Sequence, residues 1–218
     1  MFVTPDGGLT TAGYLLCGAA AVLLFLFAGF FSQPSKGKAS TKQLVYCGAA
    51  MGLAFLTSYF RLFKLPFGGS VTLFSMLFIC LIGYWYGLRV GLTTGFAYGI
   101  LQFLQDPYVL SVFQVCCDYL FAFAALGLSG LFCRSKHGLI KGYLLGVLGR
   151  GLFHSIGGYL YWMAYMPDNF PKSLGAVYPI VYNYSYLLAE AAVTIAILLL
   201  PPVSRALGEV KRNAVSQH

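Results

Sequence analysis

Residues 108–132 read YVLSVFQVCCDYLFAFAALGLSGLF, an apolar run whose only charged side chain is Asp118. A helix of about 20 apolar residues is long enough to cross the hydrocarbon core of a bilayer. The run is continuous and lacks the period-two alternation of a membrane β-strand. It therefore predicts a transmembrane helix that carries a carboxylate inside the membrane.

The rest of the chain repeats this pattern. Of its 218 residues, 59% are hydrophobic and 9% are charged, and the mean hydropathy is +0.76, whereas about 25% of the residues of a soluble domain are charged. We expect an all-α integral membrane protein without membrane strands, and with helices near 10–33, 42–62, 73–87, 89–105, 108–132, 140–165 and 176–200. The expected parts are an additional N-terminal transmembrane helix and linker (1–41), a six-helix bundle (42–202) and a polar tail that frays (203–218).

The Lys and Arg side chains predict the orientation, because cytoplasmic loops are enriched in them. One side has only Arg61, Lys64 and Lys172. The other side has ten: Lys36, Lys38, Lys42, Arg89, Arg134, Lys136, Lys141, Arg205, Lys211 and Arg212. The N-terminus is therefore expected outside the cell and the C-terminus in the cytoplasm. Topology explains the net charge of +8, so no nucleic-acid partner is indicated.

Ionisable groups are rare inside the predicted helices, where each costs about 2.5–3.5 kcal/mol. They are Asp118, Glu190, Arg150 and the imidazole of His154. With about 1.5 Å of rise per residue, Asp118 lies about 15 Å below the outer end of its helix and His154 about 18 Å. Asn183 lies about 12 Å deep by the same measure. These three polar side chains, from three helices, share one level in the outer half of the bundle.

Aromatic side chains gather toward the same outer end. They are Tyr108, Tyr119, Tyr161, Trp162, Tyr165, Tyr178, Tyr182 and Tyr184. Each alone is typical of the aromatic belt at a membrane interface. Together with a carboxylate, an imidazole and a carboxamide at one depth, they predict a pocket for a flat cationic heteroaromatic ligand, because ring faces attract cations.

Arg150 and Glu190 lie deeper than this cluster, at similar depths, and are expected to form a structural ion pair. A pair between Arg150 and Asp118 is the alternative, and it would partly neutralise the cation site. The six cysteines have no C-x-x-C spacing, so we expect neither a metal site nor disulfides.

The chain resembles the thiamine-specific substrate-capture (S) components, the ThiT/YuaJ family, of energy-coupling-factor (ECF) transporters. The resemblance covers residues 42–200 and rests on short motifs in several helices and loops. They are residues 65–72 (LPFGGSVT), 86–92 (YGLRVGL), 98–102 (YGILQ), 126–132 (LGLSGLF), Asp118 with Tyr119, His154 with Trp162, and Tyr178 with Asn183.

The resemblance implies a prokaryotic plasma-membrane protein that binds thiamine in the outer half of a six-helix bundle. Asp118 stands where the family usually has a glutamate that binds the aminopyrimidine, and His154, Tyr178 and Asn183 complete that polar end. Trp162, Tyr108 and Tyr119 match aromatic positions that enclose the rings. The chain departs from the family in the shorter Asp118 side chain and in one additional residue at 73–76 in the outer loop. The helix before Lys42 also lies outside the six-helix pattern.

The family also implies partners. The chain lacks the G-x-x-x-x-G-K-[ST] phosphate loop, so ATP would be used only by two ATPase subunits, and no cofactor is expected. Gly48 and Gly52 provide the small-xxx-small spacing at which helices approach closely. They match the family's contact surface for the transmembrane coupling (T) subunit, although packing within the bundle also explains such spacing.

Three other functions are alternatives to thiamine capture. In the first, Ser129 in Gly-Leu-Ser-Gly and His154 resemble the dyad of a rhomboid intramembrane serine protease. The two side chains are expected about 12 Å apart in depth, so a hydrogen bond between nucleophile and base is not expected and we predict no enzyme. The second is an S component for another vitamin, and the third is a stand-alone channel or secondary carrier.

Overall fold

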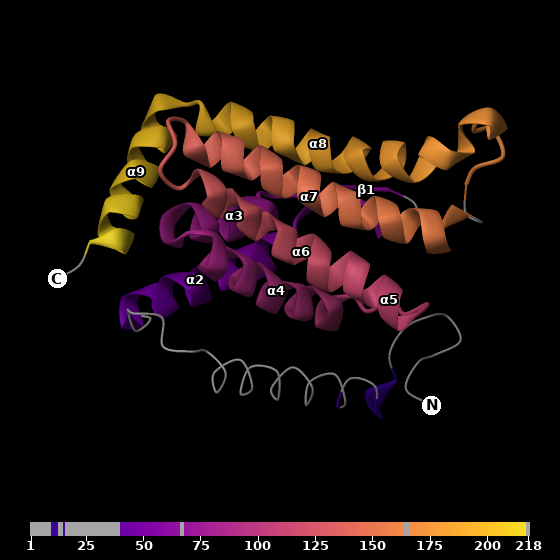
Figure 1. Ribbon diagram of the computed structural model, residues 1–218, viewed down its shortest axis with the longest axis horizontal. Coiled ribbons are helices and arrows are strands. Elements are labelled where there is room, and N and C mark those ends of the chain that lie inside the picture. The colour runs from indigo at the N-terminus through magenta and orange to yellow at the C-terminus, as the bar shows by residue number, and fades with distance from the viewer. Residues whose placement is uncertain (1–9, 13–14, 16–39, 66–67, 164–165, 217–218) are drawn as a thin grey trace.

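The computed structural model describes residues 10–12, 15, 40–65, 68–163 and 166–216, and these form a bundle of helices with one β-hairpin (Figure 1). The elements in chain order are α2 (Thr41–Ser58), β1 (Arg61–Lys64), β2 (Ser70–Thr72), α3 (Ser75–Tyr86), α4 (Leu88–Gln105), α5 (Val112–Val115), η2 (Cys116–Phe121), α6 (Ala122–Ala124), η3 (Ala125–Phe132), α7 (Gly138–Tyr161), η5 (Lys172–Val177), α8 (Tyr178–Leu198) and α9 (Pro201–Val215). The predicted helix at 10–33 lies almost entirely outside the described residues. The seven-helix count therefore stays a prediction.

Two helical stretches of the described chain are long and apolar enough to cross a bilayer. Val112–Phe132 has 21 residues and a mean hydropathy of 1.8, and Lys172–Leu198 has 27 residues and a mean hydropathy of 1.4. The apolar helix Ser75–Tyr86 is shorter than a full span. The predicted apolar span at 108–132 is thus helical, but it begins at Val112, where the Ser111 hydroxyl accepts a hydrogen bond from the Gln114 backbone N–H (3.0 Å).

That helix is not a regular α-helix. Its middle, Cys116–Phe121, is π-helical, and its last part, Ala125–Phe132, is a 3₁₀-helix. Single π-helical turns inside helices are frequent at functional sites, because they change which side chains face a neighbouring element. Asp118 lies inside this π-helical turn.

Helix α4 packs against the irregular helix through glycines spaced four residues apart. A Cβ at Gly95 would contact the Phe123 carbonyl oxygen, and one at Gly99 would contact the Tyr119 carbonyl oxygen. Small residues at this spacing let membrane helices approach closely. The backbone of α4 therefore fixes the position of the turn that holds Asp118.

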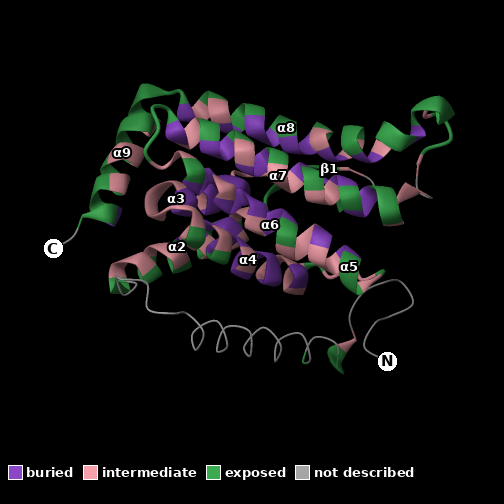
Figure 2. Ribbon diagram, in the orientation of Figure 1, coloured by how far each residue is buried: buried purple, intermediate pink, exposed green. Residues whose placement is uncertain are grey.

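The core lies where α3, α4, η3 and α7 meet, and these elements contain most of the buried residues in Figure 2. Met76, Ile79 and Leu126 are fully buried there, as are Tyr98 and Tyr143. Helix α8 buries one face against α7 and exposes the other (Figure 2).

The connecting regions contain two elements that the sequence analysis did not predict. The outer loop contains an antiparallel hairpin, in which Lys64 pairs with Ser70 and Gly68 takes a positive φ of 98°. The tail expected to fray forms α9, which crosses the end of the bundle (Figure 1). Val203 and Leu207 of α9 pack against the core, and Tyr86 donates a hydrogen bond to the Ala214 carbonyl (3.1 Å).

Candidate ligand-binding site

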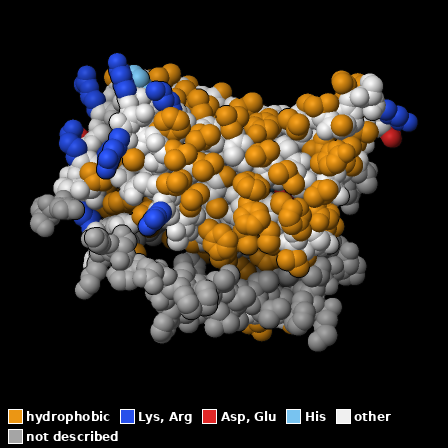
Figure 3. Space-filling model, in the orientation of Figure 1, with side chains coloured by type: hydrophobic (Ala, Val, Ile, Leu, Met, Phe, Trp, Pro, Cys, Tyr) orange, Lys and Arg blue, Asp and Glu red, His pale blue; other side chains and the backbone are white. Residues whose placement is uncertain are grey.

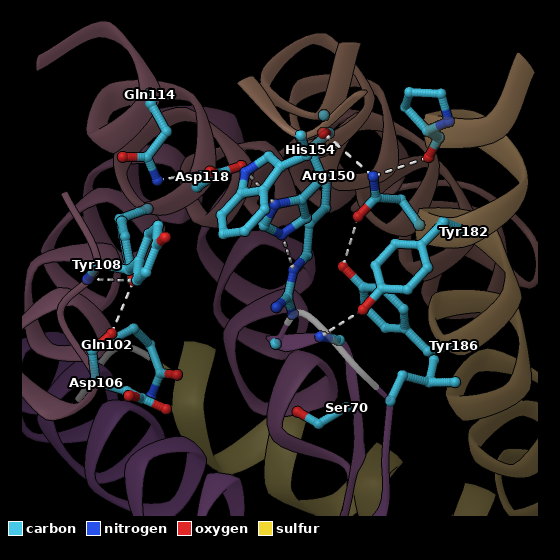
Figure 4. Close-up of a pocket in the computed structure, with 18 of the residues that line it drawn as sticks. Ser70, Gln102, Asp106, Tyr108, Gln114, Asp118, Arg150, His154, Tyr182 and Tyr186 are labelled. Atoms are coloured by element: carbon cyan, nitrogen blue, oxygen red, sulfur yellow. Dashed lines mark hydrogen bonds and ion pairs between the residues drawn. The ribbon is translucent and has the colours of Figure 1, made fainter. Parts of the chain in front are cut away.

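A cavity of about 820 Å³ lies at the hairpin end of the bundle. Its walls come from the hairpin, the end of α4, the π-helical turn, α7 and α8 (Figure 4). All seven side chains predicted to contact a ligand line it: Tyr108, Asp118, Tyr119, His154, Trp162, Tyr178 and Asn183. The fold thus brings together residues that are up to 75 positions apart in the sequence.

Asp118 is held from two sides. Gln114, one turn earlier, donates from Nε2 to Asp118 Oδ2 (2.8 Å), and His154 Nδ1 lies 3.2 Å from Asp118 Oδ1. Helix α7 approaches the Asp118 carboxylate closely at Gly157. A Cβ at this position would lie only 2.9 Å from Asp118 Oδ1. The carboxylate is therefore fixed by hydrogen bonds, and each oxygen keeps acceptor capacity for a ligand.

Arg150 completes a chain of hydrogen bonds along α7. Its Nε donates to His154 Nε2 at 3.2 Å. Arginine cannot accept a hydrogen bond, so His154 Nε2 must be the unprotonated acceptor and Nδ1 must carry the hydrogen that His154 donates to Asp118. The guanidinium carbon of Arg150 lies 4.2 Å from the centre of the Phe123 ring, within the range of a cation–π contact.

The predicted ion pair between Arg150 and Glu190 requires correction. Within the described residues, no ion pair joins Arg150 to Glu190 or to Asp118. Glu190, which is 4% exposed, instead accepts hydrogen bonds at Oε2 from the backbone N–H and the hydroxyl of Thr72, both at 2.8 Å. The hairpin thus supplies the polar partners of this carboxylate, and Arg150 lines the cavity instead.

Asn183 has most of its hydrogen-bonding capacity engaged by the protein. Its Nδ2 donates to the carbonyls of Pro179 (2.8 Å) and His154 (3.2 Å), and its Oδ1 accepts from the Tyr186 hydroxyl (2.9 Å). Both amide hydrogens are therefore used, and Oδ1 is the atom with capacity left for a ligand. Asn183 also ties α8 to α7 beside the cavity.

The aromatic side chains fall into two groups on the cavity wall. Tyr108 and Trp162 pack with ring centres 5.0 Å apart at 32°, and Tyr178 packs against Tyr182 at 6.0 Å. The Tyr119 hydroxyl donates to the Asp106 carbonyl (2.7 Å) and accepts from the Tyr108 backbone N–H (3.2 Å). These contacts fix the rings before any ligand enters.

Several lining residues were not singled out as ligand contacts from the sequence. Gln114 and Arg150 each lie four residues before a predicted site residue, a spacing that places side chains on the same helix face. That spacing was the available signal. The hairpin residues Arg61, Lys64 and Ser70 also line the cavity, and no periodicity in the sequence indicated them.

The charges around the cavity are mixed. Arg61 of the hairpin pairs with Asp106 at the end of α4 (3.0 Å). Asp118 and Arg150 are separated by the neutral His154 ring, and Lys64 is exposed. The part of the chain that the structure describes contains no group of three or more His, Cys, Asp or Glu side chains suited to a metal ion.

Ser129 and His154 do not form a dyad in the described structure. The fully buried Ser129 hydroxyl donates to the Cys80 carbonyl (2.8 Å), and both ring nitrogens of His154 bond to Asp118 and Arg150. A serine nucleophile needs a base within hydrogen-bond reach. The geometry gives Ser129 a packing role.

Known proteins resemble this chain over most of its length. The family profile described as Thiamine transporter protein (Thia_YuaJ) matches residues 44–207. Thiamine transporter ThiT of Bacillus subtilis (strain 168) is 30% identical over 156 residues, covering 63% of this chain and 77% of that protein. A solved structure of ThiT from Listeria monocytogenes has a similar fold, with a TM-score of 0.62 at 24% identity, covering 76% of this chain and 96% of that one.

Proposed function

This chain belongs to the Thia_YuaJ thiamine transporter family, and we propose that it captures thiamine in the 820 Å³ cavity as the S subunit of an ECF transporter. It is a membrane protein and a component of thiamine transport. One observation carries the assignment of the site. The seven residues selected by depth and family resemblance, from four separate segments, all line one cavity.

The cavity suits the two halves of thiamine. The aminopyrimidine has an amine that donates hydrogen bonds and ring nitrogens that accept them. Asp118 and Asn183 Oδ1 offer acceptors, and the Arg150 side chain, which extends into the cavity (Figure 4), offers donors. The cationic thiazolium ring would then lie toward Tyr108 and Trp162, away from the Arg150 charge.

The shorter Asp118 side chain is compatible with this pose. The π-helical turn and the close approach at Gly157 set the carboxylate against α7, where Gln114 and His154 hold it. Preorganised acceptors favour binding because little side-chain entropy is lost. We infer that Asp118 accepts the ligand amine in this position.

Partner docking is proposed on α2. At Gly48 and Gly52, an added Cβ would meet no described atom within 4 Å. Leu44 and Leu56 on the same helix are 63% and 60% exposed in the described chain. Such a surface of small and apolar residues fits close packing with another membrane helix, and we propose that the T subunit, which carries the two ATPase subunits, binds there.

The proposed orientation follows the charges. Lys and Arg side chains gather at the end of the molecule where α9 lies (Figure 3), and cytoplasmic ends of membrane proteins are enriched in these residues. We propose that this end faces the cytoplasm of a prokaryotic cell and that the cavity opens to the outside. The proposed parts remain residues 1–41, the bundle 42–202 and the cytoplasmic segment 203–218.

The two tryptophans provide the test of thiamine binding. Trp162 lines the cavity, whereas Trp85 on α3 packs against Tyr46 and does not line it. Thiamine should change the fluorescence of the purified Trp85→Phe protein in a saturable way, and the change should be absent in Trp162→Phe. Displacement of radiolabelled thiamine by unlabelled thiamine is the second measurement. If neither shows saturation, or if another vitamin saturates the site instead, the thiamine assignment is wrong.

The transport mechanism has a separate test. Proteoliposomes that contain this chain alone should take up thiamine far more slowly than those that also contain the T and ATPase subunits with ATP. Equal uptake without ATPases would instead indicate a stand-alone carrier. Labelling of Ser129 by a fluorophosphonate probe would indicate a serine hydrolase.

A further inference from the structure

A second cavity, which we call the groove, lies between α7 and α8. Its volume is about 510 Å³, and its lining residues are Leu152, Ser155, Ile156, Tyr159, Leu160, Ala176, Pro179, Ile180 and Tyr184. Pro179 lines this groove and also the ligand cavity. At Gly158, beside Pro179, an added Cβ would lie 2.9 Å from the proline ring. The groove and the ligand cavity are therefore separated by a single layer of residues.

The groove has a buried polar atom without a partner. Its lining is mostly aliphatic, and the Tyr184 hydroxyl already donates to the Leu148 carbonyl (2.8 Å). Ser155 is 7% exposed, and its hydroxyl has no hydrogen-bond partner among the described residues. A buried hydroxyl without a partner carries a desolvation cost that no hydrogen bond offsets. An occupant of the groove that brings an acceptor would remove this cost.

The groove opens on an apolar part of the surface, which the proposed orientation places in the bilayer. Leu152, Tyr159 and Leu160 along its edge are between 54% and 56% exposed, and α8 belongs to the candidate span Lys172–Leu198. Hydrophobic side chains cover the flank of the molecule between its two ends (Figure 3). Because α7 ends at Tyr161 and not near residue 165 as expected, Ser155 lies only six residues, or about 9 Å, below the outer end of the helix. With the outer end of α7 at the membrane surface, this depth is close to the boundary between headgroups and acyl chains, because each interfacial layer is about 5–8 Å thick.

We propose that this groove binds a phospholipid, with one acyl chain along the aliphatic wall and an ester carbonyl accepting the hydrogen bond of Ser155. An acyl chain matches the mostly aliphatic lining of the groove, and the ester carbonyl matches the buried Ser155 hydroxyl, which has no partner in the described chain. The lipid would brace the wall formed by Pro179 and Gly158. Lipid binding here is independent of which ligand occupies the larger cavity.

The groove can be filled without changing the buried bundle. Ala176 is exposed and lines the groove, so Ala176→Phe would place a ring in it. Ala189 is also exposed on α8 but does not line the groove, so Ala189→Phe is the matched control. The probe is a phosphatidylglycerol with a diazirine on one acyl chain, in nanodiscs that contain the full chain.

Mass spectrometry should map cross-links to groove residues of α7 and α8 in the native chain and in Ala189→Phe. In Ala176→Phe they should fall by about tenfold, the change expected when two methylene groups lose their burial. Ser155→Ala should keep the cross-link positions but release the lipid about fivefold more readily in detergent, because one hydrogen bond is lost. Equal labelling in both Phe variants, or label spread evenly over all lipid-facing helices, would overturn the proposal. Unchanged release from Ser155→Ala would overturn the hydrogen bond.

Discussion

Arg150 donates its Nε hydrogen to His154 Nε2 at 3.2 Å, and this contact determines which nitrogen of His154 carries a proton. Because arginine is only a donor, the imidazole must be neutral with its hydrogen on Nδ1, which points at Asp118 (3.2 Å). Arg150, whose side chain lines the same cavity as Asp118, has no ion-pair partner among the described residues. A charge of this kind inside a membrane protein indicates a functional role.

Replacement of Arg150 by methionine should weaken thiamine binding without destabilising the protein. We expect the affinity to fall about tenfold or more, since a hydrogen bond to a charged group contributes about 1.5–3 kcal/mol. The melting temperature should change little, because Arg150 is only partly buried and lines the cavity, where water can replace its hydrogen bond to His154. Isothermal titration calorimetry and thermal unfolding in detergent measure the two effects.

The control for this variant is Arg89→Met, which removes an exposed cation elsewhere and should leave the affinity unchanged. Nitrogen-15 spectra of labelled histidine, assigned with His154→Gln, should show a neutral Nδ1–H form in the native chain. A charged imidazole there, or a large loss of stability with full affinity in Arg150→Met, would contradict the interpretation.

Asp118→Asn and Glu190→Gln should separate the roles of the two carboxylates. Asp118 lines the cavity, whereas Glu190 does not line it and bonds to Thr72 of the hairpin. We expect Asp118→Asn to lower thiamine affinity about 10- to 100-fold, because it removes a charged acceptor. Glu190→Gln can still accept from Thr72 and should change the affinity less than about threefold. Equal losses in calorimetry would show that Glu190 also acts on the ligand.

Gly157→Ala should weaken ligand binding by displacing the Asp118 carboxylate. The added Cβ would lie 2.9 Å from Asp118 Oδ1, so the carboxylate must move away from His154. Binding should weaken several-fold, at a stability cost of about 1–3 kcal/mol for the overpacked contact. The matched control is Gly208→Ala on α9, where no described atom lies within 4 Å of the new Cβ. It should stabilise the helix by about 0.5–1 kcal/mol and leave binding intact.

Depth along the helices was predictable from the sequence because the rise of a helix is nearly constant. It grouped Asp118, His154 and Asn183, which line one cavity in the structure. The direction in which each side chain points was harder to predict from the sequence. The π-helical turn around Asp118 depends on packing between helices. The bond from Arg150 to His154 joins residues four apart on one helix, but the sequence does not show which neighbour the guanidinium contacts, so the interpretation of Arg150 as an ion-pair partner of Glu190 failed.

The hairpin and α9 were missed for different reasons. Pairing between Arg61–Lys64 and Ser70–Thr72 depends on contacts with α8, such as the bond from the Gly69 backbone N–H to the Tyr182 hydroxyl (3.0 Å), which periodicity does not reveal. For α9, a usable signal was present. Val203, Leu207, Val210 and Ala214 recur every three or four residues, a helical period that the polar composition of the tail concealed.

Gly48→Leu combined with Gly52→Leu should separate ligand capture from transport. Neither added side chain would meet a described atom near its Cβ, so the double variant should fold and bind thiamine with native affinity. Two leucines on a closely packed interface cost about 1–3 kcal/mol each, so co-purification with the T and ATPase subunits should fall at least about tenfold. ATP-dependent uptake should fall with it.

Gly146→Leu is the contrast, because its Cβ would lie 3.1 Å from the Leu126 backbone and 3.2 Å from Cys80 Sγ. That variant should lose stability and thiamine binding together. If the double variant still assembles with its partners, the docking surface lies elsewhere on the bundle, whereas loss of thiamine binding in it would show that α2 supports the cavity itself.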